Sequence, residues 1–344
     1  MDSDSTTPKP RLALTLPLGG AESAVELARY AQARGHEELW LAEVAGGDAY
    51  AIAGALAVGA PGMRIGTAVV PAQTRTPMVH AMAAMSLSQL TSGKFVLGLG
   101  LSSPNIVKDW GGQPYDQPLT RLREHVQVLR KALQGERVDF EGKTLHVKRF
   151  KLGGAVSGQV PIYLGALNEK ALRLAGELCG PPVESALPQI LGAVRAGAEA
   201  AGRDYKKIEV VSRLHVVMTD NPEQGRTLVR NVFGAYAATP GYNRCFEWIG
   251  FEREAKAIRE YYAKGDRAGV AASVSDGLCD AMAVVGTKET VRARVRAYAE
   301  QGIDVCVINP IADPAGVRSI LDGLQGCLDG VRAEGLGVVR ATRG

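Results

Sequence analysis

The first residue with an evident chemical use is Glu43, which follows the apolar segment Leu39-Trp40-Leu41. In a barrel of parallel strands the chemistry lies at the carboxyl ends of the strands, so a carboxylate directly after a short strand is a candidate catalytic group. Such a group can act as an acid or a base, and burial raises its pKa. A helix cap or a solvated loop residue would look the same in the sequence, and both interpretations stay open.

Two glycine-containing turns are candidates for binding an anion. The first is Gly98-Leu99-Gly100-Leu101-Ser102-Ser103, and the second is Gly165-Ala166-Leu167-Asn168. Glycines let a ligand approach the backbone, and hydroxyl and free N–H groups suit a phosphate. The first turn lacks the third glycine and the following helix of a dinucleotide-binding fingerprint. An ordinary tight turn and an asparagine helix cap are the alternatives.

The other reactive residues exclude several chemistries. No two of the five histidines have the i, i+4 spacing of a helical metal site, so we expect no metal. His125 lies between charged residues of a predicted helix and is expected at the surface. The five cysteines are scattered without a C-x-x-C pair, which favours reduced thiols in the cytoplasm. The chain has no lysine at a strand end for a Schiff base, no G-x-S-x-G and no Walker loop.

The segments that must position these residues alternate between apolar strands and amphipathic helices. Predicted strands begin near residues 12, 38, 64 and 95, in steps of 26, 26 and 31 residues. The predicted strands are 12–16, 39–41, 65–70, 95–99, 161–165, 208–218 and 305–309. The predicted helices are 22–34, 49–58, 77–90, 118–133, 169–178, 188–201, 222–236, 250–264, 288–301 and 317–328. This alternation indicates βα units around a parallel sheet.

The number of strand positions favours an α/β fold of the (β/α)8 barrel type with insertions, and a doubly wound open sheet is the alternative. We expect a disordered lead over 1–10, one barrel domain over 11–330 and a C-terminal tail over 331–344. Insertions are expected around 135–155, which contains a predicted hairpin, and around 236–285. The sixth strand position, 181–185, is poor strand material because it begins with two prolines.

Composition excludes several classes of protein. Of 344 residues, 46% are hydrophobic and 22% are charged, which are globular values and not those of a disordered chain. The net charge of +4 is too small to indicate nucleic-acid binding, and no apolar run reaches the length of a membrane helix. The acidic, polar N-terminus does not resemble a secretory signal, so we expect a cytoplasmic protein.

Several segments together resemble the luciferase-like flavin and deazaflavin family, in its coenzyme F420-dependent branch. The segments are LWLAE at 39–43, RIGTAVV at 64–70, TRTP at 74–77, LTSGKFVLGLG at 90–100, RLRE at 121–124, VPIYLGA at 160–166, KALRLAGE at 170–177, VVGT at 284–287 and GIDV at 302–305. No single motif is specific, but their order and spacing are. The match runs from about residue 11 to residue 325.

The resemblance implies a luciferase-like (β/α)8 barrel with the ring of coenzyme F420, or alternatively FMN, at its mouth. It implies a bulge in the third strand with a cis peptide bond at Ala68–Val69, and a cofactor tail on the two anion-binding turns. It also implies a homodimer with helices near the second and third strands at the interface. The cofactor-binding residues that it implies are Thr67, Ala68, Val69, Gly98, Gly100, Leu101, Ser102, Ser103, Gly165, Ala166, Leu167 and Asn168.

Two departures from the family pattern concern the substrate side. Relatives carry Trp-His-Gly after the fourth strand, where this chain has Trp110-Gly111-Gly112, so a histidine that could donate a proton is absent. Relatives carry Asp-Gly-Trp after the fifth helix, where residues 180–185 read GPPVES. Both changes affect the expected substrate more than the expected cofactor.

The resulting prediction is an F420H2-dependent reductase that transfers a hydride to an electron-poor C=C, C=N or C=O bond of a small molecule or a peptide, or runs in reverse as a dehydrogenase. Glu43 is the predicted acid or ring-orienting group. The predicted substrate pocket contains Trp110, Tyr115, Tyr242, Asn243 and Phe246. The alternatives are an FMNH2-dependent monooxygenase and a cofactor-binding protein without catalysis.

Overall fold

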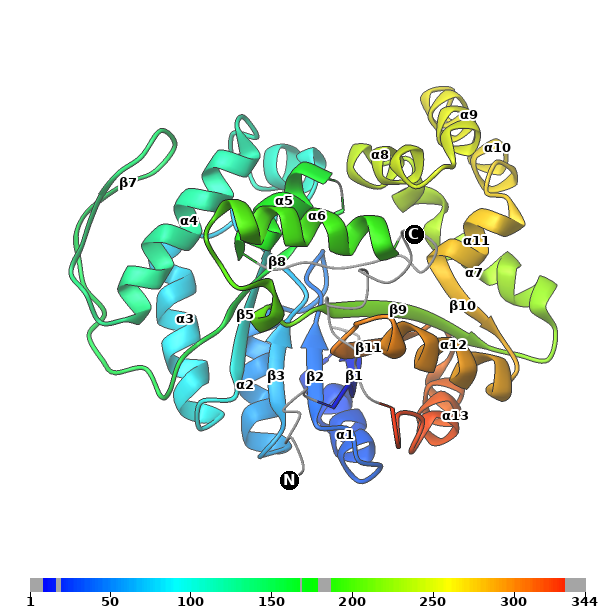
Figure 1. The fold of residues 1–344 in the computed structure, drawn as a ribbon, viewed down its shortest axis with the longest axis horizontal. Coiled ribbons are helices and arrows are strands. Elements are labelled where there is room, and N and C mark those ends of the chain that lie inside the picture. The colour runs from blue at the N-terminus through cyan, green and yellow to red at the C-terminus, as the bar shows by residue number, and fades with distance from the viewer. Residues whose placement is uncertain (1–8, 17–19, 168, 179–186, 332–344) are drawn as a thin grey trace, which may run out of the picture. The chain divides into compact units, whose positions relative to one another are not determined.

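The computed structural model describes residues 9–16, 20–167, 169–178 and 187–331 (Figure 1). The chain divides into two compact units, Leu14–Ala166 and Met1–Ala13 with Leu167–Gly344, which we call the N-terminal and C-terminal units. The predicted sixth strand and most of the predicted lead and tail lie outside the described residues. The single barrel domain over 11–330 stays a prediction.

The N-terminal unit is built on parallel strands in the order β1, β2, β3, β5, with β4 and β8 also paired to β5. The strands are β1 Arg11–Leu16, which begins in the C-terminal unit, β2 Glu38–Leu41, β3 Arg64–Thr67, β4 Val70–Pro71, β5 Phe95–Gly100 and β8 Ile162–Gly165. β2 and β5 are buried along their whole length, as expected for strands covered on both faces. The parallel βα organisation predicted for this part of the chain is confirmed.

The helices of this unit begin and end as their sequence signals indicate. They are α1 Ala21–Gln32, α2 Ala49–Gly59, α3 Pro77–Leu90, α4 Pro118–Leu133 and the six-residue π-helix η1 Asn105–Trp110. Asp48 caps α2 by accepting hydrogen bonds from the backbone N–H groups of Tyr50 and Ala51, both at 2.9 Å. Gly35 ends the α1 segment with a φ of 81°, which favours glycine. α3 and α4 have the predicted bounds.

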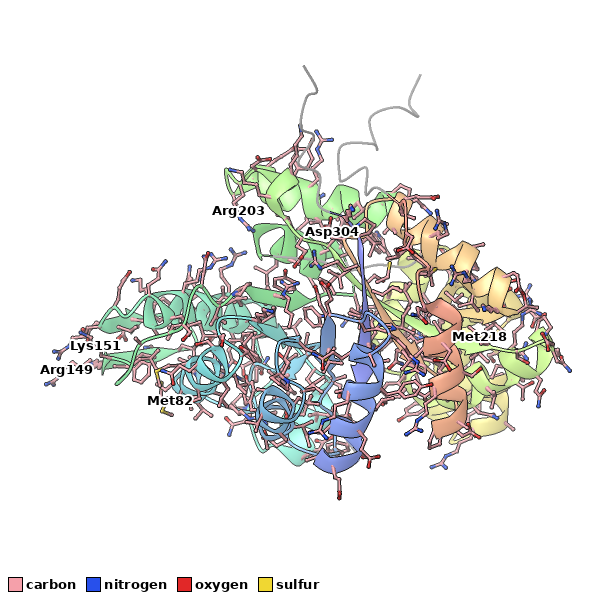
Figure 2. All side chains as sticks on the ribbon, turned by 90° about the horizontal axis from the view of Figure 1, so that it is seen from below. Met82, Arg149, Lys151, Arg203, Met218 and Asp304 are labelled. Atoms are coloured by element: carbon pink, nitrogen blue, oxygen red, sulfur yellow. The ribbon has the colours of Figure 1, made fainter. Side chains whose placement is uncertain are left out.

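A two-stranded hairpin, β6 Val138–Glu141 and β7 His146–Phe150, lies within the segment expected to be an insertion. The carboxylate of Glu124 on α4 holds its turn by accepting hydrogen bonds from the backbone of Lys143, Thr144 and Leu145 at 2.7–2.9 Å and from the Thr144 hydroxyl at 2.6 Å. Burial raises the pKa of Glu124, but these hydrogen bonds outweigh burial and hold it below its usual value. Beyond this anchor the hairpin segment carries Arg149 and Lys151 into solvent (Figure 2).

The C-terminal unit has a long central strand, β9 Val211–Met218. It pairs in parallel with β11 Val305–Pro310 and, over its last four residues, with β10 Ala283–Gly286. The flanking helices are α5 Glu169–Leu178, α6 Leu187–Ala200, α12 Lys288–Glu300 and α13 Pro314–Leu324, with a short 3-10 turn η3 Tyr205–Lys207. The core on this side joins residues of β9, β10 and β11 to α6, α12 and α13.

A helical segment follows β9 and has a second core of its own. It consists of α7 Pro222–Ala237, α8 Pro240–Trp248, α9 Glu252–Ala263, α10 Arg267–Ala272 and α11 Asp276–Met282. The sequence analysis did not predict β10, α8, α10 or α11, because these elements are too short to show a clear period. Side-chain caps mark two of them, since Asp266 accepts from Gly269 N–H at 2.8 Å and Ser275 accepts from Leu278 N–H at 3.2 Å.

The last helix and the third strand differ from their predicted bounds. α13 ends at Leu324 and not at residue 328, because Gln325 is extended and Gly326 has a φ of 63°. The predicted strand 65–70 is divided into β3 and β4 by a cis peptide bond between Ala68 and Val69. The cis bond that the family resemblance implied is thereby confirmed.

A partly buried carboxyl group, Asp304, lies just before β11 in the C-terminal unit (Figure 2). Its Oδ2 accepts a hydrogen bond from Val210 N–H at 2.7 Å, and Arg11 forms an ion pair with the neighbouring Glu209. Burial raises the pKa of Asp304 to about 6, because the Val210 hydrogen bond and Arg11 only partly offset burial and the repulsion from Glu209.

We expect Asp304→Asn to stabilise the protein at neutral pH. Because the folded pKa lies above the unfolded value, the native carboxyl group loses stability as the pH rises from about 4 to 6, and the cost is complete above pH 6. Urea unfolding at pH 7.5 should show the Asn variant more stable by about 1–3 kcal/mol, and the difference should vanish near pH 4. Asp116→Asn, at an exposed aspartate, is the control. An equal gain at both pH values would contradict the titration.

Candidate active site

A cavity of about 330 Å³ lies in the N-terminal unit, among the segments that follow β2, β4 and β5. It is lined by Glu43, Val44, Pro71, Thr74, Arg75, Ile106, Trp110 and Gly111. The structure therefore brings together two residues that the sequence analysis had singled out separately. Glu43 is the predicted catalytic group, and Trp110, 64% exposed, is a predicted wall of the substrate pocket.

The carboxylate of Glu43 forms a two-pronged ion pair with Arg75. The two guanidinium nitrogens of Arg75 donate to Oε1 at 2.7 Å and to Oε2 at 2.8 Å, and Ala49 N–H donates to Oε2 at 2.9 Å. Both oxygens are therefore acceptors, and in this arrangement Glu43 has no proton to give. The geometry favours a role in holding Arg75 and orienting a ligand over the role of acid.

Arg75 also donates to the carboxylate of Asp48, so one cation holds two acidic groups at the cavity wall. The hydrogen bonds to Glu43, the largest effect, raise the pKa of Arg75 further above its ordinary value. Burial raises the pKa of Asp48, but the Ala51 N–H and Arg75 outweigh burial and hold it below its usual range. Arg75 was not predicted as a site residue, although it stands in the TRTP segment directly after the third predicted strand, and that place is the signal that marks it.

A layer of aromatic side chains supports Arg75 from behind. The guanidinium lies 5.1 Å from the centre of the Tyr50 ring, a cation–π contact. The Tyr50 hydroxyl donates to His80 Nδ1 at 2.5 Å, and His80 Nε2–H donates to the Ala72 carbonyl at 3.3 Å. Because the carbonyl can only accept, the proton of His80 must be on Nε2. Burial lowers the pKa of His80 to about 3, so the ring is neutral.

His125 corrects an expectation from the sequence. It was expected at the surface but is only 1% exposed. Its Nδ1 is 2.8 Å from the Arg121 carbonyl, and its ring contacts the edge of His80 with centroids 6.3 Å apart. Burial lowers its pKa. The charged residues next to His125 in the sequence point to other faces of α4. The helical periodicity, and not the charge of the neighbours, therefore determines that His125 is buried.

The turn from β3 to β4, residues Thr67–Val69, packs against three glycines. The Thr67 hydroxyl donates to the Gly98 carbonyl and accepts from the Gly98 N–H, both at 2.8 Å. A Cβ at Gly98 would lie 1.7 Å from the Thr67 carbonyl oxygen, and one at Gly100 would lie 2.3 Å from a Val69 methyl group. Gly165 is also tight, at 3.1 Å from Val69. These glycines make room for the turn, so their space is not open to a ligand.

We expect Gly98→Ala to destabilise the N-terminal unit severely. The new methyl group meets backbone that cannot move without breaking the Thr67 hydrogen bonds, so the free energy of unfolding should fall by about 3 kcal/mol or more. Gly192→Ala in α6 is the control, because nothing lies within 4 Å of its Cβ and alanine favours a helix. Equal stability of the two variants in urea unfolding would contradict the packing.

The loop after β5 is fixed by local hydrogen bonds. Ser102 has a φ of 60°, and the Tyr115 hydroxyl donates to its carbonyl at 3.1 Å. The Ser103 hydroxyl accepts from Ile106 N–H at 3.4 Å at the start of η1. Tyr115 thus positions the loop and is absent from the cavity lining. Of the second predicted turn, Ala166 is buried, Leu167 is 38% exposed and Asn168 lies outside the described residues.

The three remaining predicted pocket residues belong to the C-terminal unit. Phe246 is buried in the core of the helical segment, and Tyr242 packs against that core. Asn243 is 1% exposed, and its amide donates to the carbonyls of Ala237 and Ala255 at 3.3 and 2.9 Å. Phe246 and Asn243 therefore stabilise the segment, and a place in a substrate pocket stays a prediction for all three.

Within the described residues no cluster of histidine, cysteine or acidic side chains could hold a metal ion. Among the same residues, no helix combines the length and the apolar composition that crossing a membrane requires.

The family model for luciferase-like monooxygenases matches residues 5–305. The chain belongs to this luciferase-like family. The resemblance found in the sequence is thereby confirmed.

Two curated relatives of this family member carry related names. A protein provisionally named a coenzyme F420-dependent oxidoreductase, from Mycobacterium tuberculosis, is 26% identical over 330 residues, which are 87% of this chain and 94% of the relative. A 5,10-methylenetetrahydromethanopterin reductase from Methanolobus tindarius is 28% identical over 305 residues, which are 85% of this chain and 91% of the relative. These names agree with the prediction that the chain is an oxidoreductase.

Solved structures agree on the fold. The F420-dependent tetrahydromethanopterin reductase of Methanopyrus kandleri superposes with a TM-score of 0.78 at 20% identity, covering 92% of this chain and 98% of that one. An F420-dependent secondary alcohol dehydrogenase gives 0.74 at 17% identity, with the same coverage. An FMN-binding Baeyer–Villiger monooxygenase from Pseudomonas putida gives 0.65 at 18% identity, covering 95% and 99%. The predicted luciferase-like α/β barrel class is confirmed, and identities this low show the fold alone.

Proposed function

We propose that this protein is a coenzyme F420-dependent oxidoreductase acting on a small-molecule or peptide substrate. The observation that carries the proposal is the cavity after β2, β4 and β5. The Glu43–Arg75 pair and the exposed Trp110 all line this cavity. This is the place where the family resemblance puts the ring of the cofactor. When bound, reduced F420 supplies a hydride for an electron-poor C=C, C=N or C=O bond, and the oxidised form accepts one.

The residues that line the cavity suit the planar, polar ring of the proposed cofactor. Trp110 offers an aromatic face, and Arg75 and Glu43 offer a donor and an acceptor at the wall. The turn Thr67–Val69 and the loop Leu101–Ser103 are the segments that would hold the cofactor. Gly98, Gly100 and Gly165 support them from behind, because the space at their Cα atoms is filled by Thr67 and Val69.

The chain's own contribution to the reaction is orientation and charge. Arg75 is held from two sides by Glu43 and Asp48, so it fixes the position of both carboxylates at the cavity wall. The neutral His80 and Tyr50 keep Arg75 in place. We assign Glu43 to orienting Arg75 and the ligand. The four cysteines of the described part of the chain are free and buried, in keeping with the cytoplasmic location that we propose.

The test is a fluorescence titration of the purified protein with F420 and, separately, with FMN. We expect saturable micromolar binding of F420 and much weaker binding of FMN. Trp110→Leu should weaken F420 binding about fivefold or more, because stacking on one aromatic face is worth about 1 kcal/mol or more. Tyr262→Leu, at an exposed tyrosine of α9, is the control and should leave the affinity unchanged.

Two results would contradict the proposal. Preference for FMN would move the protein to the monooxygenase alternative, and binding of neither cofactor would leave the family fold without its redox chemistry. Glu43→Gln then tests the assigned role. Measured with any hydride acceptor that the wild-type enzyme reduces, Glu43→Gln should lower turnover about tenfold. The affinity for F420 should change less than threefold. Unchanged turnover would remove Glu43 from the mechanism.

We also propose that the protein is a homodimer through the outer faces of α2 and α3. Neither helix contains an Asp, Glu, Lys or Arg residue, and a helix that is apolar all round is normally covered. Four of their apolar side chains are exposed: Val58 (71%), Val79 (40%), Met82 (46%) and Leu90 (49%). Met82 projects from the outer side of α3 (Figure 2).

Light scattering after size exclusion tests this interface. The wild-type chain should be a dimer at micromolar concentration. Met82→Glu should weaken the dimer at least tenfold, because a charge would be buried without a partner. Leu228→Glu on α7, equally exposed, should remain dimeric. A monomeric wild type, or equal effects of the two variants, would contradict the interface.

A further inference from the structure

Polar residues occupy one face of β9, in the C-terminal unit. Leu214 and Val216 point into the core that β9 shares with α12 and α13. Side chains alternate along a strand, so Arg213 and His215 point to the opposite face. On that face the edge of the His215 ring contacts Phe233 of α7, with centroids 4.5 Å apart. This face is therefore covered in part by the helical segment and is not simply solvated.

The His215 ring is fixed in one tautomer. It lies opposite Asn309 of β11, and the Asn309 amide donates to His215 Nδ1 at 2.6 Å. Since Nδ1 accepts, the ring proton is on Nε2. Burial, the largest effect, and the nearby Arg213 lower the pKa of His215 to about 3, so the ring is neutral and Nε2–H is a donor. No acceptor for this N–H is found among the described residues.

Two further donors lie within electrostatic reach. Arg213 interacts with both His215 and the Tyr242 hydroxyl of α8. In the described part of the chain, Arg213 has neither an ion pair nor a side-chain hydrogen bond, and the Tyr242 hydroxyl has no hydrogen-bond partner. Two carboxylates of the same unit have other partners. Glu209 pairs with Arg11, and Asp280 pairs with Arg226.

We propose that Arg213, His215 and Tyr242 form an anion-binding subsite that takes a carboxylate or phosphate group of the substrate. A partly buried guanidinium, an imidazole N–H and a phenol O–H together supply one positive charge and several donors, and of these three groups only the phenol oxygen can also accept. This combination matches the oxygens of an anion, and the guanidinium charge favours an anion over a neutral acceptor and repels a cation. The identification of the anion with the substrate rests on the proposed function, whereas the subsite itself does not.

The test measures anion binding without any cofactor, so it can fail or succeed independently of F420. Calorimetric titrations with inorganic phosphate and with acetate, at constant ionic strength, should show one site per chain for at least one of them. Arg213→Met should weaken that binding at least tenfold, about 1.4 kcal/mol, and Tyr242→Phe about threefold. Arg253→Met, at an exposed arginine of α9, is the matched control and should bind as the wild type does. Comparing the affinity for phosphate with that for acetate shows whether the subsite takes a phosphate or a carboxylate group.

The melting temperature of the free protein distinguishes a ligand-binding arginine from one that forms a structural ion pair. If Arg213 is held ready for a ligand, Arg213→Met should leave the melting temperature of the free protein unchanged or raise it, because a poorly compensated charge is removed. A melting temperature lowered by several degrees would mean that a carboxylate of the chain itself pairs with Arg213, and would overturn the proposal. Absence of saturable binding by either anion, or equal affinities of wild type and Arg213→Met, would overturn it as well.

Discussion

The candidate site depends on the close contact between the Thr67–Val69 turn and the glycines of β5 and β8. Thr67 bonds to both backbone groups of Gly98, and Val69 fills the space beside Gly100 and Gly165. Three neighbouring strands thus pack closely at their carboxyl ends, with no room for a methyl group at Gly98 or Gly100 and little at Gly165. The same turn leads into Pro71 and Arg75, so the position of the cavity wall follows from this packing. The glycines therefore influence ligand binding indirectly, because they fix the backbone of the Thr67–Val69 turn.

The charge pair above that turn links helices to strands. Glu43 follows β2 and Asp48 caps α2, so both lie in the β2–α2 connection, and Arg75 precedes α3, so one guanidinium joins two connections. Its partly buried setting makes each of these hydrogen bonds stronger than on a free surface, and removal of one partner would leave charge unpaired. The aromatic support of Tyr50 and His80 prevents Arg75 from relaxing toward solvent. The result is a rigid polar wall that adjoins the flat surface of Trp110.

Much of this arrangement could be predicted from the sequence, and the remainder has identifiable reasons. The spacing of apolar residues located α3, α4 and most of the strands, because this signal is local. The place of Glu43 at a strand end was also local. The pairing of Glu43 with Arg75, the burial of His125 and the role of Gly98 depend on contacts between residues distant in sequence. Short elements such as α10 and β10 contain too few residues to show a period.

Two partly buried arginines on strands show what distinguishes a structural charge from a binding one. Arg64 of β3 donates to Glu38 at 3.1 Å and to the Tyr163 hydroxyl at 3.0 Å, so its charge is satisfied within the N-terminal unit. Arg213 of β9 is also partly buried but, within the described residues, has neither an ion pair nor a side-chain hydrogen bond, and its charge acts on the pKa values of His215 and Tyr242. A fold that needed Arg213 for stability alone would place an acceptor beside it, as it does for Arg64. The missing acceptor is what a substrate anion would supply.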